Sequence, residues 1–247
     1  MSNIKRQSSI RSAVIPALAS PLVLGIVLGF PAGGAGPWRF ARTYGAAKPV
    51  HLGITGRNGD VTINSWNRRE IYVKALSAAP VDIHDSVMGN AVNIDVNKPQ
   101  RTKVDFEIAA PDDTSIQVKS TMGRVTISGI NGHITIDTVN GNIHLMGVRS
   151  PCVMAKTLDG DIFFDGELAG DGPFDFQSMT GDIDISLPES VSFDLVAQSL
   201  ASNINLGGFL LSPRNQHGEG VVSGKHQRGG PRLNLTTFNG RILLHKK

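Results

Sequence analysis

A short phrase recurs along the second half of this chain and constrains its fold more than any other feature. A glycine is followed by any residue and then by an apolar, polar, apolar triplet, and three close copies run from 120 to 145. Alternation at period two is typical of half-buried strands. The residue before the glycine is often Asn or Asp, and Asn-Gly or Asp-Gly favours a turn because both residues tolerate positive φ. Each copy therefore predicts a turn that leads into a strand.

The fuller phrase reads apolar, any, Gly, any, apolar, any, apolar. It fits five segments of the chain: 130–136, 139–145, 158–164, 179–185 and 238–244. A degenerate sixth copy at 200–206 has Ser202 in place of the glycine. With Ser202 counted as a glycine position, successive positions are separated by 9, 9, 19, 21 and 21 residues, and a last step of 38 to Gly240 includes an insertion. Steps near 20 match one coil of a parallel β-solenoid, and a step of 9 matches half a coil or a hairpin.

We predict an all-β fold, a β-solenoid or β-helix-like stack of short strands. Its core would be the apolar pairs that alternate inward in each copy: Val125/Ile127, Ile134/Ile136, Ile143/Leu145, Ile162/Phe164, Ile183/Ile185 and Ile242/Leu244. At about 1.5 to 3 kcal/mol per large buried side chain, such columns suffice as a core. The alternative is an antiparallel β-sandwich, because Asn-Gly turns also make hairpins. We favour the solenoid because the phrase itself recurs, whereas a sandwich needs only alternation and turns.

Other segments of the body carry weaker patterns. Alternating runs at 71–75, 92–96 and 104–109 predict further strands. Residues 78–91 are less regular and indicate a short helix or a loop. The insertion 212–231 is polar and rich in glycine, which predicts a mobile loop on one side of the stack.

The chain begins with a basic segment and an apolar run. Lys5, Arg6 and Arg11 precede Ala13–Phe30, which is apolar apart from Ser20. Positive charges on the amino side of such a run predict a cytoplasmic N-terminus and an exported body. We predict one N-terminal hydrophobic helix there, either an uncleaved membrane anchor or a cleaved signal, because its length barely suffices to span a bilayer.

The sequence divides into three predicted parts. Residues 1–35 form the export signal or single-pass membrane anchor, 36–49 form a linker rich in Gly, Ala and Pro, and 50–247 form the β-strand-repeat domain. The aromatic residues from Trp38 to Tyr44 have two interpretations. They either sit at a bilayer interface or cover the open end of the β domain.

The repeat glycines are preceded by Thr or Ser, any residue, and then Asn, Asp or Thr, as in 138–143, 157–162 and 178–183. In this pattern the chain resembles the bacterial putative-adhesin family of β-strand-repeat domains, over about residues 50–247. The resemblance implies a β-helix-like fold at the cell envelope and no known catalytic residues; the family is a domain of unknown function. The first phrase departs from the pattern, because Arg57 stands where an apolar residue is expected.

The charge distribution argues against a nucleic-acid partner. The formal net charge of +3 comes from three basic residues in 1–35, where there is no acidic residue; the body keeps 21 of the 24 basic groups against 21 acidic ones. Binding to nucleic acid needs a basic stripe that neutralises phosphates. The sequence therefore predicts no nucleic-acid binding.

The residues that could act in catalysis or metal binding are scattered along the sequence. Asp60, Asp161 and Asp182 share the position after the repeat glycine, but other residue types occupy it in the intervening copies, so we interpret them as solvated turn residues. The single Cys152 excludes an intrachain disulfide. None of the seven histidines stands in a recognised ligand spacing: His51, His84, His133, His144, His217, His226 and His245. We predict no catalytic, cofactor-binding or metal-binding residues, and no enzymatic activity.

Together these observations predict a non-enzymatic cell-envelope protein for binding, adhesion or scaffolding outside the cytoplasmic membrane. Its expected partner is an envelope protein or a cell-surface glycan, with the N-terminal segment contacting the membrane. One alternative is a carbohydrate-active β-helix enzyme, which requires Asp60, Asp161 and Asp182 to converge with a His or Arg in a groove. Another is a regulatory partner of an envelope-stress signalling complex, which would use the segment 38–44.

Ile143→Asp tests the assignment of the inward column. The substitution should unfold the body, because an unpaired charge buried among aliphatic side chains is costly. The measurement is thermal melting of the variant beside the wild type. A soluble, folded variant with unchanged melting would contradict the inward position of Ile143.

Overall fold

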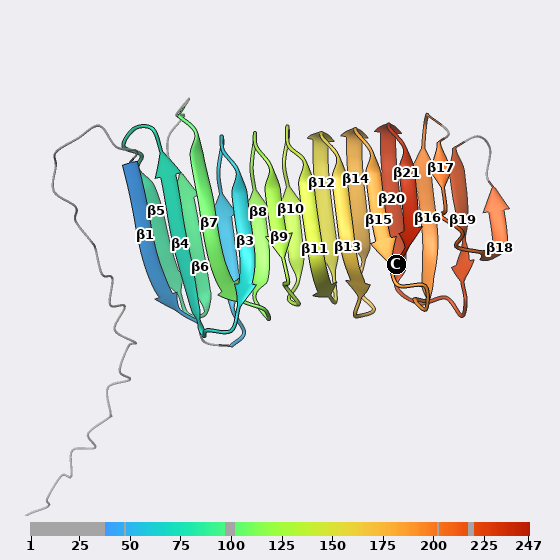
Figure 1. Ribbon diagram of the computed structural model, residues 1–247, viewed down its shortest axis with the longest axis horizontal. Helices are drawn as coiled ribbons and strands as arrows, with labels where there is room; N and C mark the ends of the chain where they lie inside the picture. Colours follow the sequence, from blue (N-terminus) through green and yellow to red (C-terminus); the bar gives the residue numbers. More distant parts are fainter. Residues whose placement is uncertain (1–37, 47, 97–101, 202, 217–219) are drawn as a thin grey trace, which may run out of the picture.

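The computed structural model describes residues 38–46, 48–96, 102–201, 203–216 and 220–247. These residues form strands and turns without a helix, and the strands lie in two sheets that face each other across one elongated core (Figure 1). The predicted export signal or anchor, residues 1–35, lies outside the described residues. Within the described ranges no helix is long and apolar enough to cross a membrane.

The first sheet, sheet A, has ten strands. In order across the sheet they are β1 (Trp38–Gly45), β4 (Glu70–Ser77), β7 (Val104–Pro111), β3 (Val61–Trp66), β9 (Val125–Ser128), β11 (Ile143–Ser150), β13 (Ile162–Leu168), β15 (Ile183–Leu187), β21 (Ile242–Lys246) and β17 (Ile204–Asn205). All neighbours from β7 to β17 are parallel. At the other end of the sheet, β4 is antiparallel to both of its neighbours, β1 and β7.

The second sheet, sheet B, has eleven strands. In order they are β18 (Leu211–Gln216), β19 (Val221–His226), β16 (Phe193–Ser199), β20 (Arg232–Asn239), β14 (Phe174–Thr180), β12 (Val153–Asp159), β10 (Ile134–Asp137), β8 (Ser115–Lys119), β2 (His51–Thr55), β6 (Ala91–Val96) and β5 (Ile83–Met88). The strands from β16 to β6 are parallel. Antiparallel pairs again occur only at the ends. The predicted solenoid is thus confirmed over the sandwich.

Each coil of the stack, here called a rung, consists of one strand of sheet B followed by one strand of sheet A. The chain crosses between the sheets at every turn from β7 to β17. The steps of 9 residues between Gly123, Gly132 and Gly141 are therefore half coils, because β9, β10 and β11 lie alternately in sheets A, B and A.

Two rungs do not follow the order of the sequence. The last rung, β20–β21, lies between β14–β15 and β16–β17. At the other end β2–β3 lies between β6–β7 and β8–β9. The rungs nearest the two ends of the described chain are consequently held between neighbours on both sides.

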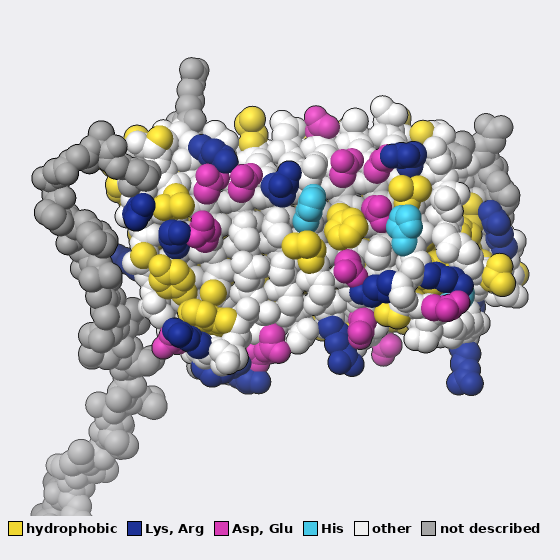
Figure 2. All heavy atoms as spheres, viewed as in Figure 1, with side chains coloured by type: hydrophobic (Ala, Val, Ile, Leu, Met, Phe, Trp, Pro, Cys, Tyr) yellow, Lys and Arg dark blue, Asp and Glu magenta, His cyan; other side chains and the backbone are white. Residues whose placement is uncertain are grey.

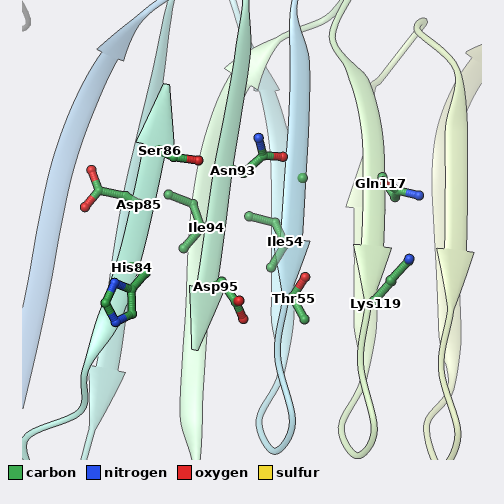
Figure 3. Close-up of a pocket in the computed structure, with 11 residues that line it drawn as sticks. Ile54, Thr55, His84, Asp85, Ser86, Asn93, Ile94, Asp95, Gln117 and Lys119 are labelled. Atoms are coloured by element: carbon green, nitrogen blue, oxygen red, sulfur yellow. The ribbon is translucent and has the colours of Figure 1, made fainter. Parts of the chain in front are cut away.

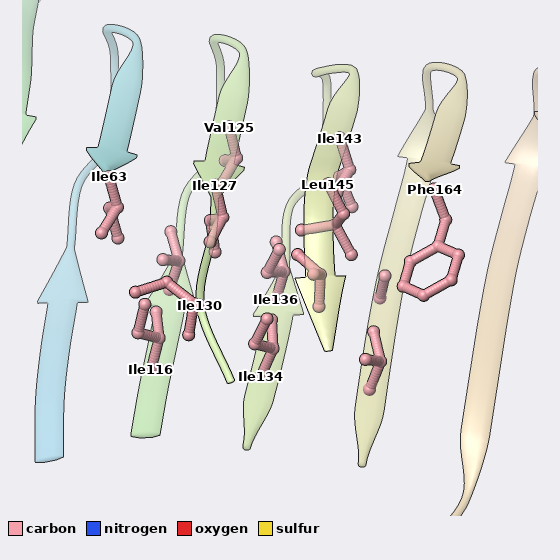
Figure 4. Packing of buried hydrophobic residues seen from close by; sticks show 14 of the residues in the cluster. Ile63, Ile116, Val125, Ile127, Ile130, Ile134, Ile136, Ile143, Leu145 and Phe164 are labelled. Carbon is pink, nitrogen blue, oxygen red and sulfur yellow. The ribbon is translucent and has the colours of Figure 1, made fainter. Parts of the chain in front are cut away.

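The predicted inward pairs form the core, and Figure 4 shows the pairs of β9, β10 and β11. All twelve side chains are at most 1% exposed. Register aligns them in columns: Ile143 lies beside Val125 in β9 and Ile162 in β13. Ile134 and Ile136 belong to sheet B and face the others across the interior.

The repeat glycines, apart from Gly132 at the opposite corner, stack at the turn from sheet B to sheet A. A Cβ atom on Gly141, Gly160 or Gly181 would lie 2.0 to 2.4 Å from the carbonyl oxygen of the glycine in the adjacent rung, which no side chain tolerates. The hydroxyl groups of Thr157 and Ser178 donate to the carbonyl oxygens of Gly141 and Gly160, at 3.1 and 2.9 Å. The Thr or Ser and the Gly of the phrase therefore serve the same contact between rungs.

Three segments that were predicted to lack strands, 36–49, 78–91 and 212–231, contain strands in the structure. The supposed linker contains β1, which pairs with β4 over eight residues. The irregular segment 78–91 contains β5, and the supposed mobile loop 212–231 contains the hairpin of β18 and β19. The physical reason is common to all three: the ends of a stack leave unpaired strand edges and exposed core, and additional strands cover them.

The aromatic residues of β1 illustrate this covering. Tyr44 is buried, and Trp38 and Phe40 pack partly buried against the core. The interpretation of this segment as a cover over the end of the β domain therefore agrees with the structure.

Gly181→Ala tests the glycine stack. Gly181 has a φ of 143° and its added Cβ would meet the Gly160 carbonyl oxygen at 2.1 Å. We expect a loss of roughly 1 to 3 kcal/mol in the free energy of unfolding, measured by urea denaturation. The matched control is Gly56→Ala, where no atom lies within 4 Å of the added Cβ. Equal stabilities of the two variants would contradict the role of close contact.

Candidate functional site

The three aspartates considered in the sequence lie on the sheet A side of the glycine corner. The Oδ1 atoms of Asp60, Asp161 and Asp182 accept hydrogen bonds, each 2.8 Å long, from the backbone N–H groups of Arg124, Asp182 and Arg241 in the adjacent rungs. Each carboxylate thus ties its rung to the next. The interpretation of these aspartates as turn residues holds, with a structural bond that the sequence did not predict.

The aspartates do not converge on one site. Asp161 and Asp182 occupy neighbouring rungs, but β9 and β11 separate Asp60 from them. Three strand spacings correspond to about 14 Å. The arrangement required by the carbohydrate-active enzyme is therefore not formed by these residues.

The pKa shifts of Asp60 and Asp182 also argue against a role as a general acid. The Arg241 guanidinium, whose Nη2 and Nε donate to Asp182 Oδ2 at 2.5 and 3.0 Å, lowers the pKa of Asp182. The Arg124 backbone N–H, followed by Lys103, lowers the pKa of Asp60. A general acid at neutral pH needs a raised pKa, so neither carboxyl suits that role.

The described histidines are dispersed over the molecule. His51, His84 and His133 are exposed on strands or turns of sheet B, and His245 is exposed on sheet A. His144 contacts the Phe163 ring, and burial lowers its pKa. His217 lies outside the described residues.

His226 is the one buried histidine among those described. Its Nδ1 lies 2.9 Å from the Leu210 carbonyl oxygen, and its ring packs against Phe193 and Phe209. It is therefore part of the core at the C-terminal end of the stack. Across the described ranges no three His, Cys, Asp or Glu side chains are placed to hold a metal ion.

The remaining candidates also have structural roles. Cys152 is half-buried, and burial raises the pKa of its thiol, which disfavours a reactive thiolate. Asp113 pairs with Lys48 and Arg69 at 2.7 Å each. On the face shown in Figure 2, acidic and basic side chains are interspersed rather than gathered into a patch of one sign.

A different feature, on the outer side of sheet B, has no such structural role. The first apolar residue of the phrase is exposed in five adjacent rungs, and we call these residues the apolar ladder: Val139, Leu158, Met179, Phe238 and Leu200. Register places Met179 between Leu158 and Phe238. Their exposure ranges from 36 to 61%.

A shallow groove of about 360 Å³ runs beside the apolar ladder. Four of the five ladder residues line one side of the groove, from Leu158 to Leu200 in stack order. The facing row is polar and includes Lys156, Gln177 and Gln198. An apolar ridge rimmed by polar groups is typical of a protein-binding surface.

The sequence of the domain matches one known protein family over more than half of the chain. The sequence profile of the Toastrack DUF4097 family matches residues 112–245, more than half of the chain. The chain belongs to the Toastrack DUF4097 family. No curated protein matches it.

Two solved structures match this Toastrack chain over most of its length. A putative cell adhesion protein from Clostridium sporogenes has a TM-score of 0.51 at 13% identity, and the alignment covers 86% of this chain and 100% of that one. A putative adhesin from Bacteroides fragilis has a TM-score of 0.38 at 11% identity, covering 86% of this chain and 99% of that one. The first of these supports the two-sheet architecture and nothing further, because identity is so low.

The match to the Toastrack family encloses the whole apolar ladder, since its residues lie between 139 and 238. These residues belong to the repeated phrase, but the phrase alone did not predict that they lie outside the core. Alternation along the strand could have predicted their exposure. Ala155 and Thr157 point inward, and Leu158, which follows Thr157, therefore points outward. Ile130 occupies the same place in the phrase yet is buried, because it lies at the opposite corner of the rung.

The lowered pKa of Asp182 predicts a pH-dependent contribution to stability. A carboxyl group whose pKa is lower in the folded state stabilises the fold above its unfolded pKa, about 4, and this contribution is lost as pH falls through the folded pKa. Asp182→Asn should therefore be less stable than wild type at pH 7 and approach it at pH 3, by a modest amount because the pair is partly exposed. Urea denaturation measures both, with Asp171→Asn as the control. A difference that is constant over this range would contradict the pairing.

Proposed function

We propose that this Toastrack protein is a non-enzymatic binding protein of the cell envelope, which holds a protein partner on its apolar ladder and serves adhesion or scaffolding. The observation that carries the proposal is the recurrence of a large apolar side chain at one exposed position in five rungs. The core does not use these side chains, and their exposure to water is unfavourable unless a partner covers them.

The composition around the ladder favours a protein partner over an anionic membrane surface. The described charged side chains next to it are Asp137, Lys156 and Asp159, which include one base and two acids. Attraction to an anionic bilayer would need an excess of basic residues. The polar row that includes Gln177 and Gln198 supplies the hydrogen-bonding rim that protein interfaces have.

The location at the envelope belongs to the same proposal. Its support is the N-terminal sequence, in which a basic segment precedes the apolar run Ala13–Phe30. The name of the Clostridium sporogenes relative, a putative cell adhesion protein, is consistent with this location. In this arrangement residues 1–35 direct export or anchor the chain, and the stack lies outside the cytoplasmic membrane.

The test is capture of partners from solubilised envelopes by tagged full-length protein. The double variant Met179→Ser/Phe238→Ser replaces the two central ladder residues with small polar ones. It should lose most of a partner that wild type retains, because central apolar side chains dominate such interfaces. The matched control is Met154→Ser, a half-buried outward methionine of sheet B outside the ladder.

Several results would contradict the proposal. Equal capture by the ladder variant and the control would remove the ladder from binding. Concentration-dependent dimers in sedimentation that only the ladder variant abolishes would make a second copy the occupant. Hydrolysis of an envelope polysaccharide by the purified protein would overturn the non-enzymatic assignment.

A further inference from the structure

A depression lies on the outer face of sheet B, toward the N-terminal end of the stack and apart from the apolar ladder. Register places five outward residues in one row across β5, β6, β2, β8 and β10: Ser86, Asn93, Gly53, Gln117 and Thr135. Gly53, in the middle of the row, has no side chain. The surface is therefore hollow between the amides of Asn93 and Gln117.

The hollow extends to both sides of Gly53. One half, of about 410 Å³, is bordered by His84, Asp95 and Lys119, and Figure 3 shows these side chains around β2. The other half, of about 420 Å³, is bordered by His51, Ser115 and His133. Gly53, Asn93 and Gln117 line both halves, so the two form one depression that crosses five strands. Four strand spacings give it a length of about 19 Å.

The two amides at its centre are available to a ligand. The Asn93 Oδ1 atom lies over Gly53, where an added Cβ would approach it to 2.4 Å. Both side chains are exposed, and among the described residues neither amide makes a hydrogen bond to the protein. Each offers two donors and one acceptor, the complement of neighbouring hydroxyl groups, which both donate and accept.

The charged and apolar residues that line the depression disfavour both a strongly anionic ligand and a lipid. Asp95 and Lys119 carry opposite charges on either side of Thr55, and Asp85 is already bonded to Arg42 and Tyr44. A strongly anionic ligand would need a cluster of bases, which this lining lacks. No Phe, Tyr or Trp lines either half, and the aliphatic residues turn their side chains into the core, which disfavours a lipid.

We propose that this depression binds a neutral segment of a glycan chain, with Asn93 and Gln117 bonding to sugar hydroxyl groups above Gly53. The elongated shape suits a chain of sugars lying across the strands. Because the lining has no Phe, Tyr or Trp to stack on the sugar, a single site binds weakly, with a Kd on the order of 1 mM. This site does not depend on the apolar ladder, which lies on other strands of the same face.

The experiment titrates full-length, ¹⁵N-labelled protein in detergent micelles with neutral hexasaccharides: maltohexaose, cellohexaose and the hexamer of N-acetylglucosamine. Hexagalacturonate is the anionic comparison. At least one neutral chain should shift the side-chain NH₂ signals of Asn93 and Gln117 in the NMR spectrum. Failure of all three neutral chains at about 10 mM, or tighter binding of hexagalacturonate, would overturn the proposal.

Two variants and one control complete the test. Asn93→Ala/Gln117→Ala should weaken binding at least about tenfold, because it removes the central hydrogen bonds. Gly53→Ala should weaken it as well, by filling the floor and displacing the Asn93 amide; the fold tolerates it because the nearby atom ends a flexible side chain. Asn234→Ala, an amide on the same face outside the depression, should bind like wild type. Wild-type affinity in the first two variants, with unchanged melting, would refute the assignment.

Discussion

The close stacking of one rung on the next is the contact on which the rest of this structure depends. At the corner between the sheets the backbones approach so closely that only glycine fits, and each rung offers a carbonyl oxygen to the adjacent one. A threonine or serine hydroxyl donates to that oxygen, and an aspartate or asparagine oxygen accepts a backbone N–H on the other side of the turn. Buried backbone groups at the corner are satisfied in this way, and the strands are held in register.

Register at the corner has consequences on both faces of the sheets. Inward, it aligns the aliphatic side chains of neighbouring strands in columns, such as Val125, Ile143 and Ile162. Outward, it aligns whatever residue a rung presents, so a repeated apolar residue becomes a ladder and a single glycine becomes a hollow between two amides. The core and the candidate binding surfaces thus lie on opposite sides of the same strands and depend on the same register.

Covering the ends explains where the sequence-based predictions failed. A solenoid exposes strand edges and core at both ends, and here antiparallel strands cover them. These strands lie at or next to the ends of the stack and lack the repeated phrase. The segments predicted as linker, irregular region and mobile loop therefore carried weak patterns although they are ordered strands: β1, β5 and the hairpin of β18 and β19. At the corner, Asp60 and Asp182 were recognised by position, but their backbone bonds depend on the adjacent rung.

The strand phrase, the all-β class and the inward pairs could be predicted from the sequence, because period-two alternation and Asn-Gly turns are local properties of the chain. The steps of 9 residues were consistent with half a coil or a hairpin, and the alternation of β9, β10 and β11 between the sheets shows that they are half coils. Only the tertiary structure decided the order of the rungs. The placement of β20–β21 between β14–β15 and β16–β17 joins strands far apart in sequence, and no local pattern records it. The same holds for the outer surfaces: the ladder and the hollow at Gly53 exist only once the register between separate strands is set.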